Sequence, residues 1–489
     1  MKNLDEKIKL SKIHAVDIHP NEFDPKYHFY SKALKHKMNQ AGCEFFQMNN
    51  EQIILRYSRL KPSVNIDYLR QCLNYRSKFY TWGGCDLFKV VDRKGKKQLI
   101  LIESNTCASG VKSTPFFNQS DKYGPYKKLV ENFMELFEKS DTKSGDLAVI
   151  YDQNSTESSG YATCLADLTG EIVWLVQYLD ESLSVKWSDG IMYVRDADEN
   201  WHAIRGCVRL VTQKPWTKIP LISKTIVVNP IITCLAGGRN KNIASYAYKL
   251  FNAEQLENST KLGIREPYTL INVDKKDIKF LVENDVNLNK KAVIKVPYDN
   301  CGQGVYTIVN DYELRKFLNT NHNYDKFLVQ SLCGNFKWSS GQYFHLGTLP
   351  NMKTDEIFAF DVRMLVKSNR NGFSPVSVNF RRARKPLADS LINMDSSWDI
   401  LGTNLSTTIG VNNWKTDEER LMVMNDHDFT QLGMDIDDLI ESYIQTVLAM
   451  VAIDHLCIQL YDDSMKLFDF DLFKKINPDE ILINEIKVK

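Results

Sequence analysis

The stretch VIKVPYDNCGQGVYTI, residues 293–308, combines residue types that can hold a phosphate group. Apolar residues alternate along its first predicted strand, so Lys295 points away from the face that they bury. Gly302 and Gly304 follow, and glycines let backbone N–H groups approach an anion closely. A second strand comes next, so the stretch predicts a hairpin flap able to close over ATP. From these residues alone, the alternative is a surface hairpin with an exposed lysine.

The segment CIQLYDDSMKLFDFDLF predicts a second hairpin, which turns at residues 462–464. Asp469 and Asp471 would share one face of its second strand, about 6–7 Å apart. Two carboxylates at this spacing repel one another unless a cation lies beside them. Mg²⁺ is the natural candidate because it binds carboxylate and phosphate oxygens together. A solvated strand face is the alternative.

Further polar groups lie between these two hairpins in the sequence. Lys241 stands at the start of a helical segment, where an anion is favoured. FLVQSLCG reads as a strand in which Gln330 could contact the edge of an adenine ring. In FAFDVRMLVKS the side chain of Arg363 faces away from its apolar neighbours, so it could meet a phosphoryl group. FRRARKPL and LGTNLST contribute Arg382 and Asn404.

The elements that must position these groups mix helices and strands. Helical spacing covers residues 30–56, 127–138, 158–171, 240–256 and 435–454, and residues 146–152 read as a buried strand. A hairpin is expected to turn at residues 198–200, and Asn310 with Glu313 forms a capping-box pattern. We expect an α/β (α+β) protein with domains at 1–235, 236–334 and 335–489.

The composition is that of an ordinary soluble enzyme, with 489 residues, 43% hydrophobic and 25% charged. The net charge of +1 favours neither a nucleic-acid nor a membrane partner. No apolar run reaches the roughly 18 residues that cross a bilayer. The first residues lack the apolar core of a signal peptide, and the ten cysteines form no Cys-x-x-Cys pair. We therefore expect a cytoplasmic protein with reduced thiols.

The order of these motifs resembles the ATP-grasp superfamily over residues 236–475. Within that range, DVRMLV, NFRRARKPL and GTNLST are most similar to the bacterial ligases that add glutamate to protein or peptide carboxylates. The resemblance implies two α+β subdomains that grip ATP, preceded by an α/β substrate domain within residues 1–235.

The resemblance also implies a nucleotide site. Lys241 and Lys295 would contact the ATP phosphates, and Gln330 and Leu332 would lie along the adenine. The flap would consist of Asn300, Gly302, Gln303 and Gly304.

The remaining implied roles concern charge. Arg363 and Arg382 would stabilise the transferred phosphoryl group and a tetrahedral intermediate. Asp469 and Asp471, with Asn404, would hold Mg²⁺. The superfamily usually has a Glu-x-Asn pair preceded by an acid in this hairpin, whereas this chain has the two aspartates and a glutamine, Gln459. This departure would alter or weaken the metal site.

A second acidic hairpin is predicted earlier in the chain, in GGCDLFKVVDRKGKKQLILIESNTCASGVKS. Asp86 precedes its turn, and Glu103 and Asn105 share one strand face. It resembles the Asp…Glu-x-Asn segment of circularly permuted ATP-grasp proteins. Glu103 and Asn105 therefore either bind the metal or belong to a substrate domain. We favour the substrate domain because an acidic hairpin is already predicted at residues 457–473, and Ser109 and Lys112, with Gly110, would then hold an acidic substrate group.

The function that follows from the resemblance is ATP-dependent carboxylate–amine ligation through an acyl phosphate, with ATP and Mg²⁺ as cofactors. The partners would be small-molecule or peptide carboxylates and amines. A phosphotransferase of the same fold, a degraded nucleotide-binding protein and a ligase joining a carboxylate to a thiol are the alternatives.

Overall fold

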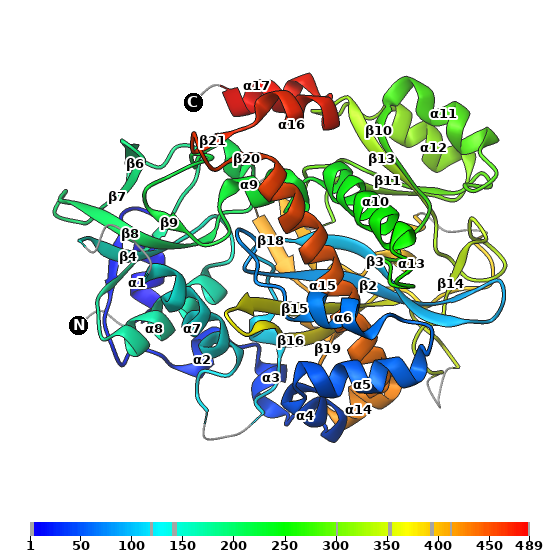
Figure 1. The fold of residues 1–489 in the computed structure, drawn as a ribbon, viewed down its shortest axis with the longest axis horizontal. Helices are drawn as coiled ribbons and strands as arrows, with labels where there is room; N and C mark the ends of the chain where they lie inside the picture. Colours follow the sequence, from blue (N-terminus) through cyan, green and yellow to red (C-terminus); the bar gives the residue numbers. More distant parts are fainter. Residues whose placement is uncertain are drawn as a thin grey trace.

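The computed structural model describes residues 4–117, 121–138, 144–299, 302–350, 355–391, 396–410 and 413–487. Its strands form three larger sheets and two short hairpins, with helices packed around and between them (Figure 1). The mixed α/β class predicted from the sequence is confirmed.

The first sheet has seven strands in the order β1-β5-β4-β8-β7-β6, with β9 beside β8. The strands are β1 Val16–Ile18, β4 Asp146–Tyr151, β5 Val173–Gln177, β6 Val185–Ser188, β7 Ile191–Arg195, β8 Trp201–Leu210 and β9 Ile226–Val227. Strand β4 is parallel to β5 and to β8. Helices α7 (Pro125–Phe137) and α8 (Ser155–Thr169) lie beside this sheet (Figure 1). The predicted β4–α8 unit and the β7–β8 hairpin are thus confirmed.

The second, central sheet is antiparallel and runs in the order β14-β2-β15-β16-β19, with β3 beside β2. Its strands are β2 Trp82–Asp92, β3 Lys97–Asn105, β14 Tyr343–His345, β15 Phe360–Asn369, β16 Gly372–Arg382 and β19 Leu421–Met422. Strand β2 pairs with β15 across a large gap in sequence. Segments expected in the first and third domains therefore share one sheet, and the three predicted ranges do not coincide with the three sheets.

The third sheet has four antiparallel strands in the order β10-β13-β11-β12. They are β10 Thr269–Asp274, β11 Ala292–Lys295, β12 Val305–Ile308 and β13 Lys326–Ser331, covered by α11 Lys275–Asn284 and α12 Asp311–Asn319. Asn310 caps α12 by accepting from the backbone N–H of Glu313 at 2.9 Å, as its position in the sequence predicts. The predicted strand–turn–strand flap is the β11–β12 hairpin.

Helix α15 (Ile436–Gln459) is the central helix of the molecule (Figure 1). It begins with a capping box between Asp435 and Asp438, and most of its residues are buried. It packs on β3, β15 and α10 (Lys241–Glu257), so it joins the central sheet to the helix that carries Lys241. Among the described residues, no helix combines the length and the apolar character that crossing a bilayer demands.

The remaining elements are short. The helices are α1 Leu4–Leu10, α2 Pro25–His28, α3 Ser31–Lys35, α4 Gln40–Gln47, α5 Asn50–Leu60, α6 Ile66–Leu73, α9 Ile231–Thr233, α13 Trp398–Leu401, α14 Asp426–Gln431, α16 Phe470–Ile476 and α17 Glu480–Lys487. The small hairpins are β17 Ser406–Gly410 with β18 Asn413–Thr416, and β20 Tyr461–Asp462 with β21 Leu467–Phe468.

Candidate functional site

Two neighbouring cavities share one wall on one face of the central sheet. The first, of about 120 Å³, is lined by the central and four-stranded sheets. The second, of about 340 Å³, is lined by the central sheet and by loops of the first sheet. The side chains common to both linings are Asn105, Arg363, Arg381 and Asn404. A group bound in one cavity would therefore lie next to a group bound in the other.

Lys241 and Lys295 meet beside the first cavity. Lys295 is 4% exposed, and its Nζ donates to the carbonyl of Ile102 at 3.0 Å. The Nζ of Lys241 lies 3.1 Å from the carboxylate of Glu103 and donates to the carbonyl of Asp299 at 2.6 Å. Burial lowers the pKa of Lys295 to about 8, although the nearby Glu103 carboxylate acts in the opposite direction. The site thus brings two cationic amines together.

The flap and the strand expected along the adenine border the same cavity. Gly302, which lines it, has a φ of 74° and Gly304 a φ of 65°, a region that favours glycine. Gln303 is exposed, and Asn300 lies outside the described residues. Gln330 lines the cavity and donates to the Thr269 hydroxyl at 2.9 Å.

Leu332 does not line the cavity, in contrast to Ser331 and Cys333 on either side of it. Its side chain packs in an apolar cluster with Trp338, and its backbone N–H donates to the Ser340 hydroxyl at 2.7 Å. The expected contact between Leu332 and an adenine ring is therefore not formed by its side chain.

The early hairpin β2–β3 supplies the acidic and amide groups of the site. Asp86 and Glu103 line the first cavity, and Asn105 lines both cavities. Asn105 is 8% exposed, and its Nδ2 has no hydrogen-bond partner among the described residues. A buried amide without a partner is costly in a folded protein unless a ligand or water satisfies it. Of the two predicted acidic hairpins, only this one lies beside Lys241 and Lys295.

An arginine–carboxylate cluster forms the shared wall. Arg363 faces Asp86 across the β2–β15 pairing and binds it with two hydrogen bonds of 2.7 and 2.8 Å. The remaining guanidinium nitrogen of Arg363, Nη1, donates to the carbonyl of Ser109 at 2.9 Å. Arg381 bridges Asp86, at 2.8 Å, and Asp361. Burial opposes ionisation of Asp86, but the two guanidinium groups outweigh it and hold the pKa of that carboxyl well below its usual value.

Arg382 lies elsewhere, which corrects the sequence-based assignment. Alternation along β16 puts Asn379 and Arg381 toward the cavities, whereas Arg382 pairs with Phe360 and points to the opposite side. There its guanidinium stacks on the ring of Phe358 at 4.6 Å and lines a separate cavity of about 350 Å³. Arg381 was not assigned to the site from the sequence. Arg381 is two residues after Asn379 on the same strand, so that both side chains share one face, and this spacing was a usable signal.

Asp469 and Asp471 are also displaced from the site. The predicted second strand ends at Phe468, and Asp469 caps α16 by accepting from the backbone N–H of Leu472 at 2.8 Å. Both aspartates are exposed, and neither lines the two cavities. Asn404, by contrast, does lie at the shared wall. Within the described ranges, no three or more His, Cys, Asp or Glu side chains are grouped to hold a metal ion.

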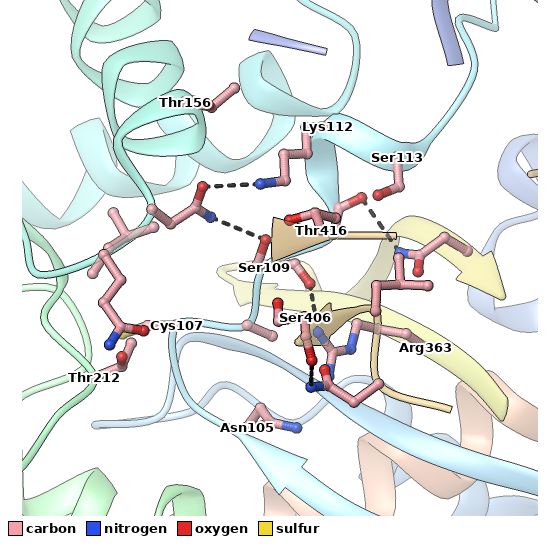
Figure 2. Close-up of a pocket in the computed structure, with 18 of the residues that line it drawn as sticks. Asn105, Cys107, Ser109, Lys112, Ser113, Thr156, Thr212, Arg363, Ser406 and Thr416 are labelled. Carbon is pink, nitrogen blue, oxygen red and sulfur yellow. Dashed lines mark hydrogen bonds between the residues drawn. The ribbon is translucent and has the colours of Figure 1, made fainter. Parts of the chain in front are cut away.

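The second cavity holds the predicted substrate residues Ser109 and Lys112 (Figure 2). Lys112 donates to the side chain of Asn154 at 3.0 Å and stacks over the Tyr30 ring at 4.8 Å. Ser109 donates to the fully buried carboxylate of Glu157 at 2.5 Å, and the backbone N–H groups of Gly110 and Val111 donate to the same carboxylate. Glu157 thus already accepts from Ser109 and Gly110, two of the groups that were expected to hold a substrate acid, whereas Lys112 is bound to Asn154.

Glu157 was not identified from the sequence. It is the third residue of α8, which Asn154 caps by accepting from its backbone N–H at 3.3 Å. The Asn-x-x-Glu spacing is typical of a helix N-terminus, so it indicated that Asn154 caps α8. It did not indicate that the Glu157 carboxylate binds the loop of residues 109–111.

No protein-family model and no curated protein matches this chain. Among solved structures, it is similar to a gamma-glutamylcysteine synthetase candidate from Methylobacillus flagellatus, with 12% identity and a TM-score of 0.47, over 87% of this chain and 98% of that one. It is also similar to a glutathione synthetase-like effector from Globodera pallida, with 13% identity and a TM-score of 0.39, over 78% of this chain and 93% of that one.

A third similar structure is a RimK-domain ATP-grasp protein from Sphaerobacter thermophilus, with 13% identity and a TM-score of 0.28. The matched region covers 48% of this chain and 90% of that one.

Proposed function

We propose that this protein is an ATP-dependent ligase of the ATP-grasp type, which joins a carboxylate to an amine through an acyl phosphate. The observation that carries the proposal is that Lys295 and the β2–β3 hairpin line one cavity that shares a wall with a larger one, while Lys241 pairs with Glu103 beside that cavity. A nucleotide and an organic substrate could then lie side by side, as group transfer requires.

The nucleotide would occupy the first cavity. Lys241 and Lys295 would neutralise its phosphates, and the backbone N–H groups of the flap around Gly302 would close over them. The apolar part of the lining suits an adenine ring and consists of Phe88, Ile102, Pro267, Val293, Val305, Cys333, Trp398 and Leu401. The polar groups of the lining would fix the orientation of the nucleotide.

Mg²⁺ would be held by Glu103 and Asn105, which corrects the assignment to Asp469 and Asp471. The fit rests on the chemistry of the donors, a carboxylate and an amide oxygen, and on the buried Asn105 amide that lacks a partner. Turning this amide would direct its oxygen into the cavity. When bound, the ion would stabilise negative charge on the transferred phosphoryl group.

The acceptor would occupy the second cavity, and its carboxylate would reach the phosphoryl group at the shared wall. Arg363, already oriented by Asp86 and Ser109, would stabilise charge on the transferring group. Arg381 would take the role that the sequence assigned to Arg382, next to the tetrahedral oxyanion. The flap would exclude water, because water would hydrolyse the acyl phosphate.

A nucleotide-binding protein without turnover is the second candidate. Asp86 is engaged by Arg363 and Arg381, and Glu103 is paired with Lys241. These ion pairs compete with a metal ion for both carboxylates. A phosphotransferase would use the same nucleotide site and would differ only in transferring the phosphoryl group to a hydroxyl.

The deciding experiment is incubation of the protein with ATP, Mg²⁺ and pools of amino acids and short peptides, followed by mass spectrometry. The ligase predicts a product whose mass is that of two components less one water, formed with stoichiometric ADP. A phosphorylated product would indicate the phosphotransferase. ATP binding without ADP release would indicate the non-catalytic protein. The Lys295→Met variant is the control for contaminating activity.

A further inference from the structure

The base of the flap is attached to the C-terminal part of the chain. Tyr298 lies between Lys295 and Gly302 and is 3% exposed. Its hydroxyl donates to the carboxylate of Asp479 at 3.1 Å and lies 3.3 Å from the side-chain oxygen of Asn477. The segment that leads from the nucleotide lysine into the flap is therefore fixed at one buried point.

Asp479 serves two elements at once. It is 1% exposed, and its Oδ1 accepts from the backbone N–H groups of Ile481 and Leu482 at 3.1 and 3.4 Å, at the start of α17. Its Oδ2 accepts from Tyr298. One carboxylate thus joins the first turn of a helix to the base of the flap, so the two cannot shift independently without breaking a buried hydrogen bond.

Helix α17 is in turn attached to two other parts of the fold. The carboxylate of Glu485 pairs with Lys214 at 2.5 Å and accepts from the indole N–H of Trp216 and the hydroxyl of Tyr324, each at 2.9 Å. The Tyr298 ring packs on Tyr324 and Trp216, with centroid distances of 4.5 and 5.9 Å. Residues 214–216 follow strand β8 of the first sheet and Tyr324 precedes β13, so α17 connects both to the flap.

We propose that Tyr298 and Asp479 are positioning residues, and that α17 is a brace that holds the flap over the phosphates. Gly302 and Gly304 have φ values that favour glycine, and the Tyr298–Asp479 bond fixes the base of the flap. Restricting the base reduces the entropy that is lost when the tip closes on a ligand. The inference rests on the proposed nucleotide site, because the flap is taken to close over a nucleotide.

The test uses variants that remove single atoms or shorten a single side chain. Tyr298→Phe deletes only the hydroxyl, and Asp479→Ser keeps a residue that caps helices well but is too short to reach Tyr298. Tyr312→Phe is the matched control, because Tyr312 is 62% exposed on α12 of the same sheet layer. Affinities for ADP and for AMP with Mg²⁺ are measured by calorimetry, and backbone hydrogen exchange is followed over residues 295–305.

We expect Tyr298→Phe to weaken ADP binding about threefold to tenfold, the range for one lost hydrogen bond, with AMP binding and the Tyr312→Phe control unchanged. Exchange over residues 295–305 should accelerate. The double variant with Asp479→Ser should bind ADP no more weakly than the weaker single variant. Additive losses, equal losses for ADP and AMP, or wild-type ADP binding in Tyr298→Phe would overturn the inference.

The outcome for the wild-type protein separates this inference from the proposed function. If the wild type binds neither nucleotide, the nucleotide site is wrong. In that case faster exchange over residues 295–305 in Tyr298→Phe still supports the brace, and unchanged exchange overturns it.

Discussion

The carboxylate of Glu103 lies 3.1 Å from the ammonium of Lys241, across the junction between strand β3 and helix α10. The acidic hairpin that comes early in the chain is therefore the one that meets the lysines and the flap. An acidic hairpin that precedes the flap in sequence and lies beside the lysines is what the less favoured alternative from the sequence, a circularly permuted arrangement, would require. The proposed metal site follows from this arrangement.

Replacing Glu103 should separate the two assignments of that residue. If it holds Mg²⁺, Glu103→Gln should raise the Mg²⁺ concentration for half-maximal ATP turnover by at least roughly 10- to 100-fold, the loss that is usual when even a partner of a metal ligand is removed. If it contacts the acceptor, only the KM for the acceptor should rise. Titration of activity with Mg²⁺ at saturating ATP distinguishes these results.

Asp469 should be important for stability rather than for turnover. Asp469→Ala removes the cap of α16 and should lower the free energy of unfolding by about 1 kcal/mol. ATP turnover and Mg²⁺ dependence should stay at the wild-type level because the side chain is exposed and lines neither cavity. Urea denaturation and a turnover assay on the same preparation test both statements, and loss of turnover in the folded variant would contradict them.

Nucleotide affinity should fall as pH rises through the pKa of Lys295, which burial lowers to about 8. Its ammonium form attracts phosphate below this pH, and its neutral amine does not above it. The dissociation constant for ADP should therefore increase, by up to tenfold per pH unit, above about pH 8. Lys295→Met should bind ADP more weakly than the wild type below about pH 8 and should lose this dependence, whereas a dependence that survives would belong to another group.

Replacing the neighbouring arginines Arg381 and Arg382 on β16 should have different effects on the free energy of unfolding. Arg381→Leu leaves the buried carboxylates of Asp86 and Asp361 without their shared partner and should cost about 3–5 kcal/mol of unfolding free energy. Arg382→Leu removes a ring contact on the other side of the strand and should cost about 1 kcal/mol or less. Chemical denaturation with ADP-binding measurements tests the contrast, and equal effects would contradict the register described here.

Glu157 should be required for the loop beside the second cavity. Glu157→Ala leaves the hydroxyl of Ser109 and the N–H groups of Gly110 and Val111 without their acceptor, which should cost about 1–3 kcal/mol or more. Because the Ser109 carbonyl orients Arg363, ATP turnover should fall more than ADP affinity. Glu171→Ala, at a half-exposed site between α8 and β5, is the control.

Local patterns predicted the parts of the site that depend on neighbouring residues. Alternation along β11 and β15 placed Lys295 and Arg363 on the correct faces, and the Asn310–Glu313 spacing located the start of α12. In DFDLF the same residues fit either an alternating strand or a capped helix, because Phe470 and Phe473 are also spaced by three. In the structure the segment is helical, with Asp469 as its cap and Phe473 buried.

Long-range pairing could not be predicted in this way. Asp86 and Arg363 are 277 positions apart, and no local signal sets the register between β2 and β15. For that reason the sequence could describe both acidic hairpins but could not determine which one would reach the lysines. The pairing of β16 with β15 likewise determines that Arg381, and not Arg382, faces the cavities. The alternation of side chains along β16 was nevertheless a clue in the sequence.

Because β2 pairs with β15, strand β2 contributes to the site only long after β2 itself has been synthesised. The lining of the first cavity runs from Asp86 to Asn404 along the chain, so the cavity stays incomplete until the later residue has left the ribosome. At roughly 5–20 residues per second, translation takes about a quarter of a minute to a minute to cover that distance. During this interval the edge of β2 that later pairs with β15 stays exposed, so the nascent chain needs protection from wrong strand partners.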